Sequence, residues 1–261
     1  DIFMKGMYEF SCGSVPNRGA HYGKKYIERW IQRDKKNCKY VLKMDIRHFF
    51  ESVDHDVLKA WLKKKIRDER MLYILELIID GSEVGLPLGF YTSQWLSNFM
   101  LQPLDHFIKE QLRIRGYGRY MDDGYLICED VRYLEECAAR IRQYCASVGL
   151  QLSEKKTRIL PIRQGVRFLK TKFKLTQTGG VIRKVQRKST RKMRQKLRKF
   201  RRWVDDGRMT EEDVRTSYES WKGHMRRGNS WKVLRKTDKL YRKLFGEKGD
   251  HQCTKFGRTG A

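Results

Sequence analysis

Two adjacent aspartates, Asp122 and Asp123, constrain this chain more than any other feature, because they stand between two strand-like runs. Aromatic and β-branched residues flank the Asp-Asp-Gly stretch within residues 117–128, which predicts a β-hairpin with the acids at its turn. Neighbouring carboxylates repel unless a cation neutralises them, so the hairpin indicates a divalent metal site. An ordinary acidic turn is the simpler interpretation of so short a motif, and the rest of the chain must decide.

The charge of the chain indicates a polyanionic partner. Its 261 residues include 58 Lys and Arg against 31 Asp and Glu, a net charge of +27. So basic a chain is expected to bind nucleic acid; a ribosomal-type structural protein or a membrane-surface binder is the alternative. We find no signal peptide and no apolar run long enough to span a bilayer, so we expect no membrane partner.

The cysteines favour a reducing compartment. They stand at positions 12, 38, 128, 137, 145 and 253, and no pair has the spacing of a zinc site or a redox Cys-x-x-Cys. We interpret them as reduced thiols and expect a cytoplasmic protein.

A second acid lies on a predicted strand. Residues 40–47 alternate, with Tyr40, Leu42 and Met44 on one face and Asp45 on the other. This period is typical of a half-buried strand, and by itself it would make Asp45 a solvated residue. The pattern that follows predicts helices at 22–33, 55–66, 70–79 and 131–148, a long helix after residue 92, and strands at 157–162 and 166–175.

Capping residues delimit several of these helices. Ser52 or Asp54 is expected to cap the helix at 55–66, Thr92 or Ser93 the long helix, and Gly149 to end the helix at 131–148. Residues 40–175 thus run strand, helices, hairpin, helix, strands. This order predicts an α+β fold, a sheet with helices packed on one face, in which the Asp45 strand can pair with the hairpin.

The composition changes after residue 181. Residues 183–202 contain twelve Lys and Arg and no acid, with apolar residues at helical spacing. Two more helices are expected at 210–226 and 230–245, and residues 246–261 are polar and expected to be disordered. A basic helical module with tryptophans is suited to bind the phosphate backbone of a nucleic-acid duplex. A solvated charged face usually carries both signs of charge, so the lack of acids counts against that alternative.

Taken in order, these stretches resemble the prokaryotic reverse transcriptases, the group II intron, retron and diversity-generating retroelement relatives. Residues 43–46 with 49–50 resemble polymerase motif A, residues 85–89 with 92–94 motif B, and residues 120–123 motif C. Residues 149–157 resemble motif D, residues 164–169 motif E, and residues 17–21 the segment before motif A. The resemblance covers roughly residues 15 to 240, which is far more specific than any single motif.

The resemblance implies a right-hand polymerase with a palm sheet backed by helices, partial fingers and an all-helical basic thumb. Residues 1–39 would form partial fingers and the entry to the palm, and residues 40–180 the palm with finger elements. Residues 181–245 would form the thumb and residues 246–261 a flexible tail.

The resemblance also implies a set of functional residues. The catalytic residues would be Asp45, Asp122, Asp123, Lys155 and Lys156. Either lysine would donate a proton to the leaving pyrophosphate or stabilise its charge. Two magnesium ions would be held by Asp45, Ile46, Asp122 and Asp123. The nucleotide would contact Phe50, Leu88, Gly89 and Gln94. Nucleic acid would contact Arg18, His21, Tyr120, Met121, Phe168, Arg194, Arg198 and Arg201.

The implied partners are an RNA template, a primer or cDNA, the RNA–DNA heteroduplex and dNTPs. Phosphate contacts carry little sequence information, so template choice would come from RNA shape or from a partner such as a small accessory protein. An RNA-dependent RNA polymerase is the first alternative, and Phe50 argues against it because an aromatic ring there would clash with a ribose 2′-hydroxyl. A non-catalytic RNA-binding scaffold is the second, and the presence of all three acids argues against it.

Leu88 points to the diversity-generating subtype. It stands where most relatives carry Gln, and residues 92–94 fit the same subtype, although Phe90 replaces the usual Asn and Leu169-Lys170 the common Leu-Gly. Leu offers no hydrogen bond to the incoming nucleotide, so we predict low-fidelity synthesis. The alternatives are that Leu88 packs beneath its loop, or that the chain is of the group II intron or retron type.

Overall fold

The structure is a computed structural model that describes residues 2–34, 37–176, 178–185 and 187–246. The chain divides into two compact units, Asp1–Ile182 and Arg183–Ala261. The predicted flexible tail, residues 246–261, lies outside the described residues apart from Gly246, and so does Cys253. The assignment of residues 1–39, 40–180 and 181–245 to separate functional domains stays a prediction.

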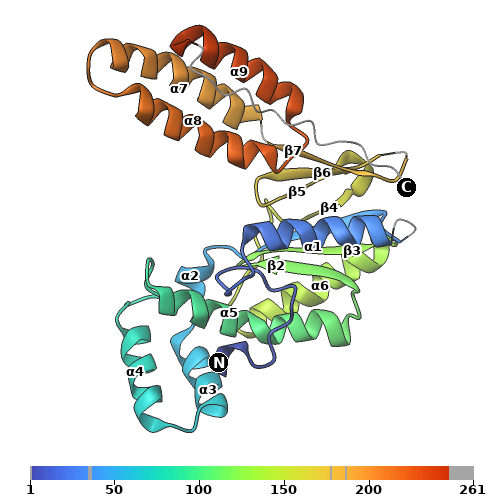
Figure 1. Ribbon diagram of the computed structural model, residues 1–261. Helices are drawn as coiled ribbons and strands as arrows, with labels where there is room; N and C mark the ends of the chain where they lie inside the picture. The colour runs from blue at the N-terminus through green and yellow to red at the C-terminus, as the bar shows by residue number, and fades with distance from the viewer. Residues whose placement is uncertain (1, 35–36, 177, 186, 247–261) are drawn as a thin grey trace. The chain divides into compact units, whose positions relative to one another are not determined.

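The first unit is built on an antiparallel sheet of four strands (Figure 1). These are β1 (Tyr40–Asp45), β2 (Gly116–Tyr120), β3 (Asp123–Cys128) and β4 (Arg158–Pro161), in the order β2-β3-β1-β4. Strand β1 pairs with β3 on one side and β4 on the other, and β2 pairs with β3 as the predicted hairpin. Asp45, at the end of β1, therefore lies beside the hairpin turn.

Helices follow the order that the sequence predicts. They are α1 (Ala20–Arg33), α2 (Phe49–Ser52), α3 (His55–Lys65), α4 (Glu69–Asp80), α5 (Tyr91–His106) and α6 (Val131–Ser147). Short 3-10 turns occupy Ile2–Met4 and Ile162–Gln164, and a π-helical segment, Phe107–Gln111, continues α5 beyond Pro103. The α+β fold class is confirmed.

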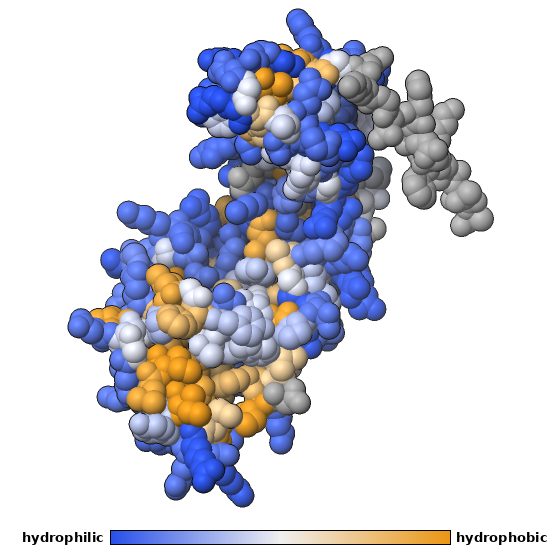
Figure 2. Space-filling model, turned by 60° about the vertical axis from the view of Figure 1, so that its left-hand side comes forward, coloured by the Kyte–Doolittle hydropathy of each residue, from blue (hydrophilic) through white to orange (hydrophobic). Residues whose placement is uncertain are grey.

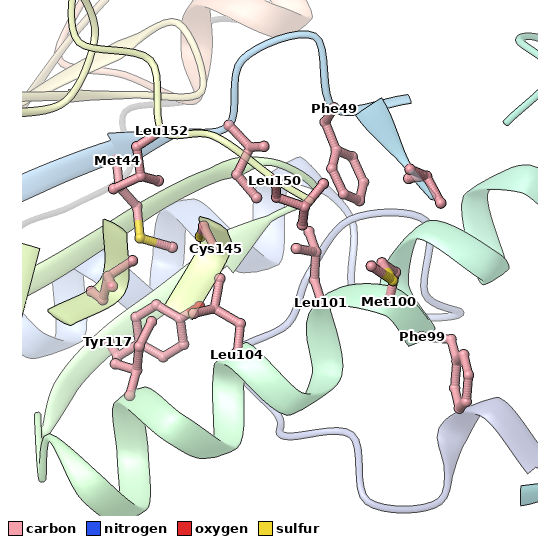
Figure 3. Packing of buried hydrophobic residues seen from close by; sticks show 14 of the residues in the cluster. Met44, Phe49, Phe99, Met100, Leu101, Leu104, Tyr117, Cys145, Leu150 and Leu152 are labelled. Carbon is pink, nitrogen blue, oxygen red and sulfur yellow. The ribbon is translucent and has the colours of Figure 1, made fainter. Parts of the chain in front are cut away.

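One face of the sheet packs on α5 and α6 (Figure 3). Met44 of β1 and Tyr117 of β2 meet Leu104 of α5 and Cys145 of α6, and all four are buried. The predicted inner face of α6 is confirmed, because Leu134, Cys137, Ala138, Ile141 and Cys145 are all buried. Full burial of one large apolar side chain contributes about 1.5–3 kcal/mol to folding, so this layer fixes the sheet that carries the acids.

The opposite face of the sheet is also covered, which the alternation in β1 did not predict. Val41, expected on the open face, is buried with Tyr125 of β3 against Ile27 and Ile31 of α1. Helix α1 packs on β2 and on β6 (Thr171–Leu175). The prediction of helices on one face only is therefore wrong at this end of the sheet, while Asp45 at the far end of β1 stays partly exposed.

The strand predicted at 166–175 is two strands. β5 (Val166–Phe168) and β6 form a hairpin in which Phe168 pairs with Thr171. Leu169 and Lys170 form its turn at φ +47° and +62°. Two successive positive φ angles are typical of the tight hairpin turn that matches strand twist, and Asn-Gly is its usual sequence signal. Its absence here explains why the sequence reads as one strand. A third strand, β7 (Val181–Val185), completes the order β5-β6-β7.

Helix ends agree with the sequence in two cases and differ in one. Asp54 caps α3 by accepting from the amides of Asp56 and Val57, and Gly149 follows α6 at φ +77°. The expectation that Thr92 or Ser93 caps the long helix is wrong. Helix α5 begins at Tyr91, its N-cap is Phe90, and that cap makes no side-chain hydrogen bond.

The described residues of the second unit include α7 (Arg187–Asp205), α8 (Glu211–Arg226) and α9 (Trp231–Phe245), so the helices expected at 210–226 and 230–245 are confirmed. Leu197 and Phe200 of α7 pack with Val214 and Tyr218 of α8, and Leu240 of α9 packs against this cluster. Thr210 begins α8 with a capping box to Asp213. The expectation that residues 181–245 are all helical is wrong at its start, because residues 181–185 form β7.

The surface of the first unit exposes several large apolar side chains. Met71, Tyr73, Ile74 and Leu77 of α4 are exposed, and apolar surface gathers on that side of the unit (Figure 2). Cys12, Cys38, Cys128, Cys137 and Cys145 are free thiols. In the parts of the chain that the structure covers, every helix is too short or too polar to cross a bilayer.

Candidate active site

The hairpin turn presents the two adjacent acids at the end of the sheet. Tyr120 pairs with Asp123 across β2 and β3, so Met121 and Asp122 form a two-residue turn. Met121 adopts φ +55°, the left-handed conformation that tight hairpin turns require. Asp123, the first residue of β3, is the direct register partner of Asp45 on β1. The structure thus brings together the three acids that the sequence predicted.

The three carboxyl groups lie in a partly buried, mutually repulsive environment. Burial raises the pKa of Asp122, and the nearby Asp45 carboxylate raises it further. Burial likewise raises the pKa of Asp123, against the Lys43 ammonium that lowers it, and both other acids add to the rise. Taking a charged carboxylate out of water disfavours it, and like charges nearby do the same. A cation at this point would relieve both effects.

Two lysines currently neutralise the acids. Lys156 Nζ donates to both carboxylate oxygens of Asp45 at 2.9 Å. Lys43 Nζ lies 3.4 Å from Asp123 Oδ1, yet that buried oxygen accepts no hydrogen bond. The described residues contain no group of three or more His, Cys, Asp or Glu side chains arranged to hold a metal ion.

The donor set nevertheless fits a hard divalent cation. Asp45, Asp122 and Asp123 offer carboxylate oxygens, the ligands that magnesium prefers, and the Asp123 oxygen without a hydrogen bond is an acceptor in need of a partner. Ile46, the fourth predicted ligand, is buried and lies opposite Leu152 in an isolated bridge. The magnesium assignment itself stays a prediction.

The structure distinguishes between the two candidate lysines. Ser153 N donates to the Asp45 carbonyl at 2.7 Å, and Lys156 N donates to the Ser153 carbonyl. This turn docks residues 153–157 on the end of β1 and brings the Lys156 ammonium to Asp45. Lys155 contributes its backbone carbonyl to Arg158 and its side chain is exposed. Lys156 is therefore the lysine of the site, a choice that the sequence left open.

The glycine loop at 85–89 is fastened to the backbone of Phe50. Leu86 N donates to the Phe50 carbonyl at 2.7 Å, and His55 Nε2 lies 2.6 Å from the Gly85 carbonyl oxygen. Gly85 adopts φ +63°, and a Cβ there would collide with the Phe50 carbonyl oxygen, so only glycine fits. The loop and Phe50, both predicted to contact the nucleotide, therefore form one structural unit.

The other predicted nucleotide contacts lie further along this segment. Gly89 is exposed at φ +91° and Gln94 is half-buried in α5. Leu88 is 69% exposed, so the alternative that it packs beneath the loop is wrong. Nothing in the described chain covers this leucine, which leaves it available to a bound molecule.

The predicted nucleic-acid contacts of the first unit fall into three groups. Arg18 donates to the Tyr8 carbonyl at 2.9 Å, while His21 is exposed at the start of α1. Tyr120 and Met121 are half-buried beside the turn. Phe168 is only 1% exposed and packs edge-on against Tyr125. Its side chain is a core residue, so the expectation that it contacts nucleic acid directly is wrong in this structure.

The predicted contacts of the second unit are not equivalent. Arg198 is exposed and Arg194 is half-buried on α7. Arg201 is held within the unit, where it donates to Asp205 and to the Leu244 carbonyl and pairs with Glu211. An arginine with three such partners has fewer donors left for phosphate, which the charge run could not reveal.

Sequence reasoning missed a buried polar cluster beneath the turn. Arg119 and Asp105 are fully buried and joined by two hydrogen bonds, Nε to Oδ1 at 2.8 Å and Nη2 to Oδ2 at 2.7 Å. Burial disfavours the charged guanidinium, but the Asp105 carboxylate outweighs this and raises the pKa of Arg119. The sequence signal was an Arg within a predicted strand and an Asp within a predicted helix, 14 positions apart, and nothing in the local pattern pairs them.

Known proteins resemble this chain over most of its first unit. A family model described as "Reverse transcriptase (RNA-dependent DNA polymerase)" matches residues 3–173. The retron Ec48 reverse transcriptase of Escherichia coli is 23% identical over 157 residues, which cover 58% of this chain and 38% of that protein. An uncharacterized 91 kDa protein in the cob intron of Schizosaccharomyces pombe is 24% identical over 231 residues, which cover 60% of this chain and 28% of that protein.

The fold also resembles a solved structure. Telomerase from Candida albicans, in complex with a TWJ fragment of telomeric RNA, matches with a TM-score of 0.55 at 14% identity, covering 96% of this chain and 48% of that one. At such low identity the match concerns the fold alone, and it agrees with a polymerase palm of mixed helix and sheet. The chain spans between 28% and 56% of the length of four curated relatives that it matches.

Proposed function

Because the chain belongs to the reverse transcriptase family, we propose that it is an RNA-directed DNA polymerase that extends a primer with dNTPs on an RNA template. The observation that carries this proposal is the pairing of Asp45 with Asp123 across β1 and β3, with Asp122 in the adjoining turn. Asp45, which is distant in sequence from the adjacent Asp122 and Asp123, thus lies with them at one end of one sheet, where their mutual repulsion has no structural use.

Magnesium is the cofactor that these residues suit. Asp45, Asp122, Asp123 and Ile46 are the residues that would hold two ions, and such ions lower the pKa of an attacking hydroxyl and stabilise charge on phosphoryl oxygens. From its position beside Asp45, Lys156 would donate a proton to the departing pyrophosphate or stabilise its charge.

Phe50 and the glycine loop are proposed to select the nucleotide. Fastened to the loop through Leu86 and Gly85, the Phe50 ring excludes a ribose 2′-hydroxyl and so favours dNTPs over rNTPs. This argues for DNA synthesis and against an RNA-dependent RNA polymerase. Gly89 and Gln94 are proposed to lie under the nascent base pair.

The template, the primer and the heteroduplex are proposed to bind through backbone phosphates. The exposed cations of α7, among them Arg198, suit a contact of this kind, as do Arg18 and His21 of the first unit. Such contacts do not read sequence, so a structured RNA or a small accessory protein would choose the template. A cytoplasmic location stays a prediction.

The finer assignment is to the diversity-generating type with low fidelity. Its support is Leu88, which is exposed in the loop and offers the incoming nucleotide bulk without a hydrogen bond. The group II intron and retron types are the competing assignments, and a retron reverse transcriptase is among the relatives.

Primer extension on an RNA template tests the proposal. The wild type should incorporate dNTPs with magnesium and stop when the metal is chelated. Asp122→Asn should lower the extension rate by about 10³-fold, because losing several kcal/mol of charge stabilisation has that effect, while RNA–DNA binding stays within about twofold.

Glu129→Gln is the matched control, since Glu129 is an exposed acid beyond β3 that pairs only at the surface with Lys39. It should extend normally. Extension by Asp122→Asn at the rate of Glu129→Gln would refute the active-site assignment. Binding without extension by the wild type would favour the non-catalytic scaffold, and extension with rNTPs would favour an RNA polymerase.

A further inference from the structure

Arg119 uses all the hydrogen-bonding capacity of its guanidinium on four residues from three segments of the first unit. Besides its two bonds to Asp105, Nη2 donates to Ser11 Oγ at 2.8 Å. Nη1 donates to Asn98 Oδ1 at 3.1 Å and to the Met121 carbonyl at 3.0 Å. A guanidinium has five N–H donors, and five bonds are made. The bond to Met121 reaches the residue directly before Asp122.

The partners of Arg119 are themselves held by further bonds. Asn98 Nδ2 donates to the Gly13 carbonyl at 2.7 Å, and the Tyr117 hydroxyl donates to Asp105 Oδ1 at 2.6 Å. Ser11 pairs with Arg119 in an isolated parallel bridge. The cluster thus joins the segment at residues 11–13, helix α5 and the hairpin into one connected network.

The turn is confined from its other side by backbone. A Cβ on Gly13 would lie 2.6 Å from Met121 N and from Met121 Cγ, so the segment at residues 11–13 lies directly against Met121. Met121 adopts φ +55°, which is unfavourable for a residue other than glycine and needs support from its surroundings. The hydrogen bond from Arg119 to the Met121 carbonyl and the close packing of Gly13 against the Met121 amide supply that support.

We propose that Arg119 is a positioning residue for catalysis, which acts through the Met121 carbonyl to hold the turn that presents Asp122. This inference rests on the proposed polymerase function. A buried ion pair is not needed for stability, because apolar or neutral residues of similar volume often replace one without loss. No apolar residue can donate a hydrogen bond to Met121, however, and lysine lacks the planar fork that reaches Asp105, Asn98 and Met121 together.

The sharpest test removes the charges while keeping the fold. In the double variant Arg119→Met with Asp105→Asn, no buried charge is left unpaired, and the amide oxygen that replaces the Asp105 carboxylate still accepts from Tyr117. We expect its melting temperature to stay within a few degrees of the wild type. We expect kcat of primer extension to fall by 10-fold or more, the KM for primer–template to stay within about twofold, and Mn²⁺ to bind more weakly to the free protein.

Hydrogen exchange supplies a readout that does not need activity. The amides of Asp122 and Asp123 should exchange faster in the double variant, while those of α6 keep their protection. Tyr133→Phe is the control, because it removes a comparable hydrogen bond, from the Tyr133 hydroxyl to the Leu112 carbonyl, away from the turn. It should change neither kcat nor exchange at the turn.

A stable double variant with kcat within threefold of the wild type and unchanged exchange at the turn would overturn the proposal. If the double variant does not fold, Asn98→Ala decides instead, since it removes one partner of the same Nη1 that donates to Met121. It should lower kcat by more than Tyr133→Phe at equal melting temperature, and equal kcat values would overturn the proposal. A wild type that does not extend primers would refute the polymerase function, and the exchange comparison would still test the placement of the turn.

Discussion

Lys156 and Lys155 offer a matched pair of substitutions that tests how the site exchanges a lysine for a metal ion. Lys156 is 66% exposed and donates to both oxygens of Asp45, whose side chain is only 13% exposed. In the described part of the chain, no ion pair joins the Lys155 side chain to the three acids. Both substitutions to alanine remove one positive charge, and only Lys156→Ala removes the contact.

The contact sets the size of the expected effect. Because Lys156 is largely exposed, its ion pair is worth about 0.2–1 kcal/mol. A cation that binds Asp45 must displace the lysine and lose this amount. Lys156→Ala should therefore tighten the binding of Mn²⁺ to the free protein by about 1.4- to 5-fold relative to Lys155→Ala.

Turnover should move in the opposite direction. If Lys156 donates a proton to the pyrophosphate or stabilises its charge, removal of the lysine lowers the single-turnover extension rate by about 10²-fold, the lower end of the range for general acid catalysis. Lys155→Ala should stay within about twofold of the wild type in this rate. Calorimetric titration with Mn²⁺ and rapid-quench primer extension measure the two quantities. Equal behaviour of the two variants, or weaker metal binding by Lys156→Ala, would refute the reasoning.

Four further predictions concern other residues of the chain. Phe50→Val should raise the rNTP-to-dNTP ratio of kcat/KM by about tenfold or more, and an unchanged ratio would assign Phe50 to packing alone. Arg198→Gln should reduce the slope of log binding constant against log salt concentration for the heteroduplex by about one unit. Arg201→Gln should reduce this slope less, because Arg201 is bonded within its own unit. Equal slopes for the two variants would contradict this difference. Leu88→Gln should lower the misincorporation rate, by tenfold for every roughly 1.4 kcal/mol of discrimination between correct and wrong nucleotides that it restores. Equal error spectra in the sequenced products of the two proteins would refute the low-fidelity proposal. Burial raises the pKa of Asp123, so the stability that this group contributes is present below about pH 3.9 and is lost as the pH rises through the folded-state pKa. Asp123→Asn should therefore melt higher than the wild type at pH 8, although it extends primers more slowly. A lower melting temperature would mean that pairing with Lys43 dominates.

Local patterns were sufficient to predict the acids of the site. The aromatic and β-branched residues around Asp-Asp-Gly predict the hairpin, and the alternation of residues 40–47 predicts β1. Both signals depend on backbone conformation over a few residues, which is the range over which strand period and turn chemistry act. The order of elements then restricted the fold to an antiparallel sheet with helices, and the resemblance identified its family.

Choices between neighbouring residues needed the tertiary structure. Lys155 and Lys156 have the same chemistry, and only the docking of Ser153 on the Asp45 carbonyl decides which one reaches the acid. Val41 and Phe168 have the pattern of residues on an open face or a binding surface. Helix α1 and the β5–β6 hairpin cover that face of the sheet, and the residues around Val41 or Phe168 do not indicate either contact.

The sequence by itself determined most of the elements, the basic second unit and the identity of the three acids, because each is encoded by the residues within one element. Only the tertiary structure decided how the turn is held. The bonds from Arg119 to Ser11, Asn98 and Asp105 join segments separated by up to 108 positions. Hydrogen bonds have a geometric requirement of about 3 Å, and no periodicity along the chain specifies which distant groups will meet it.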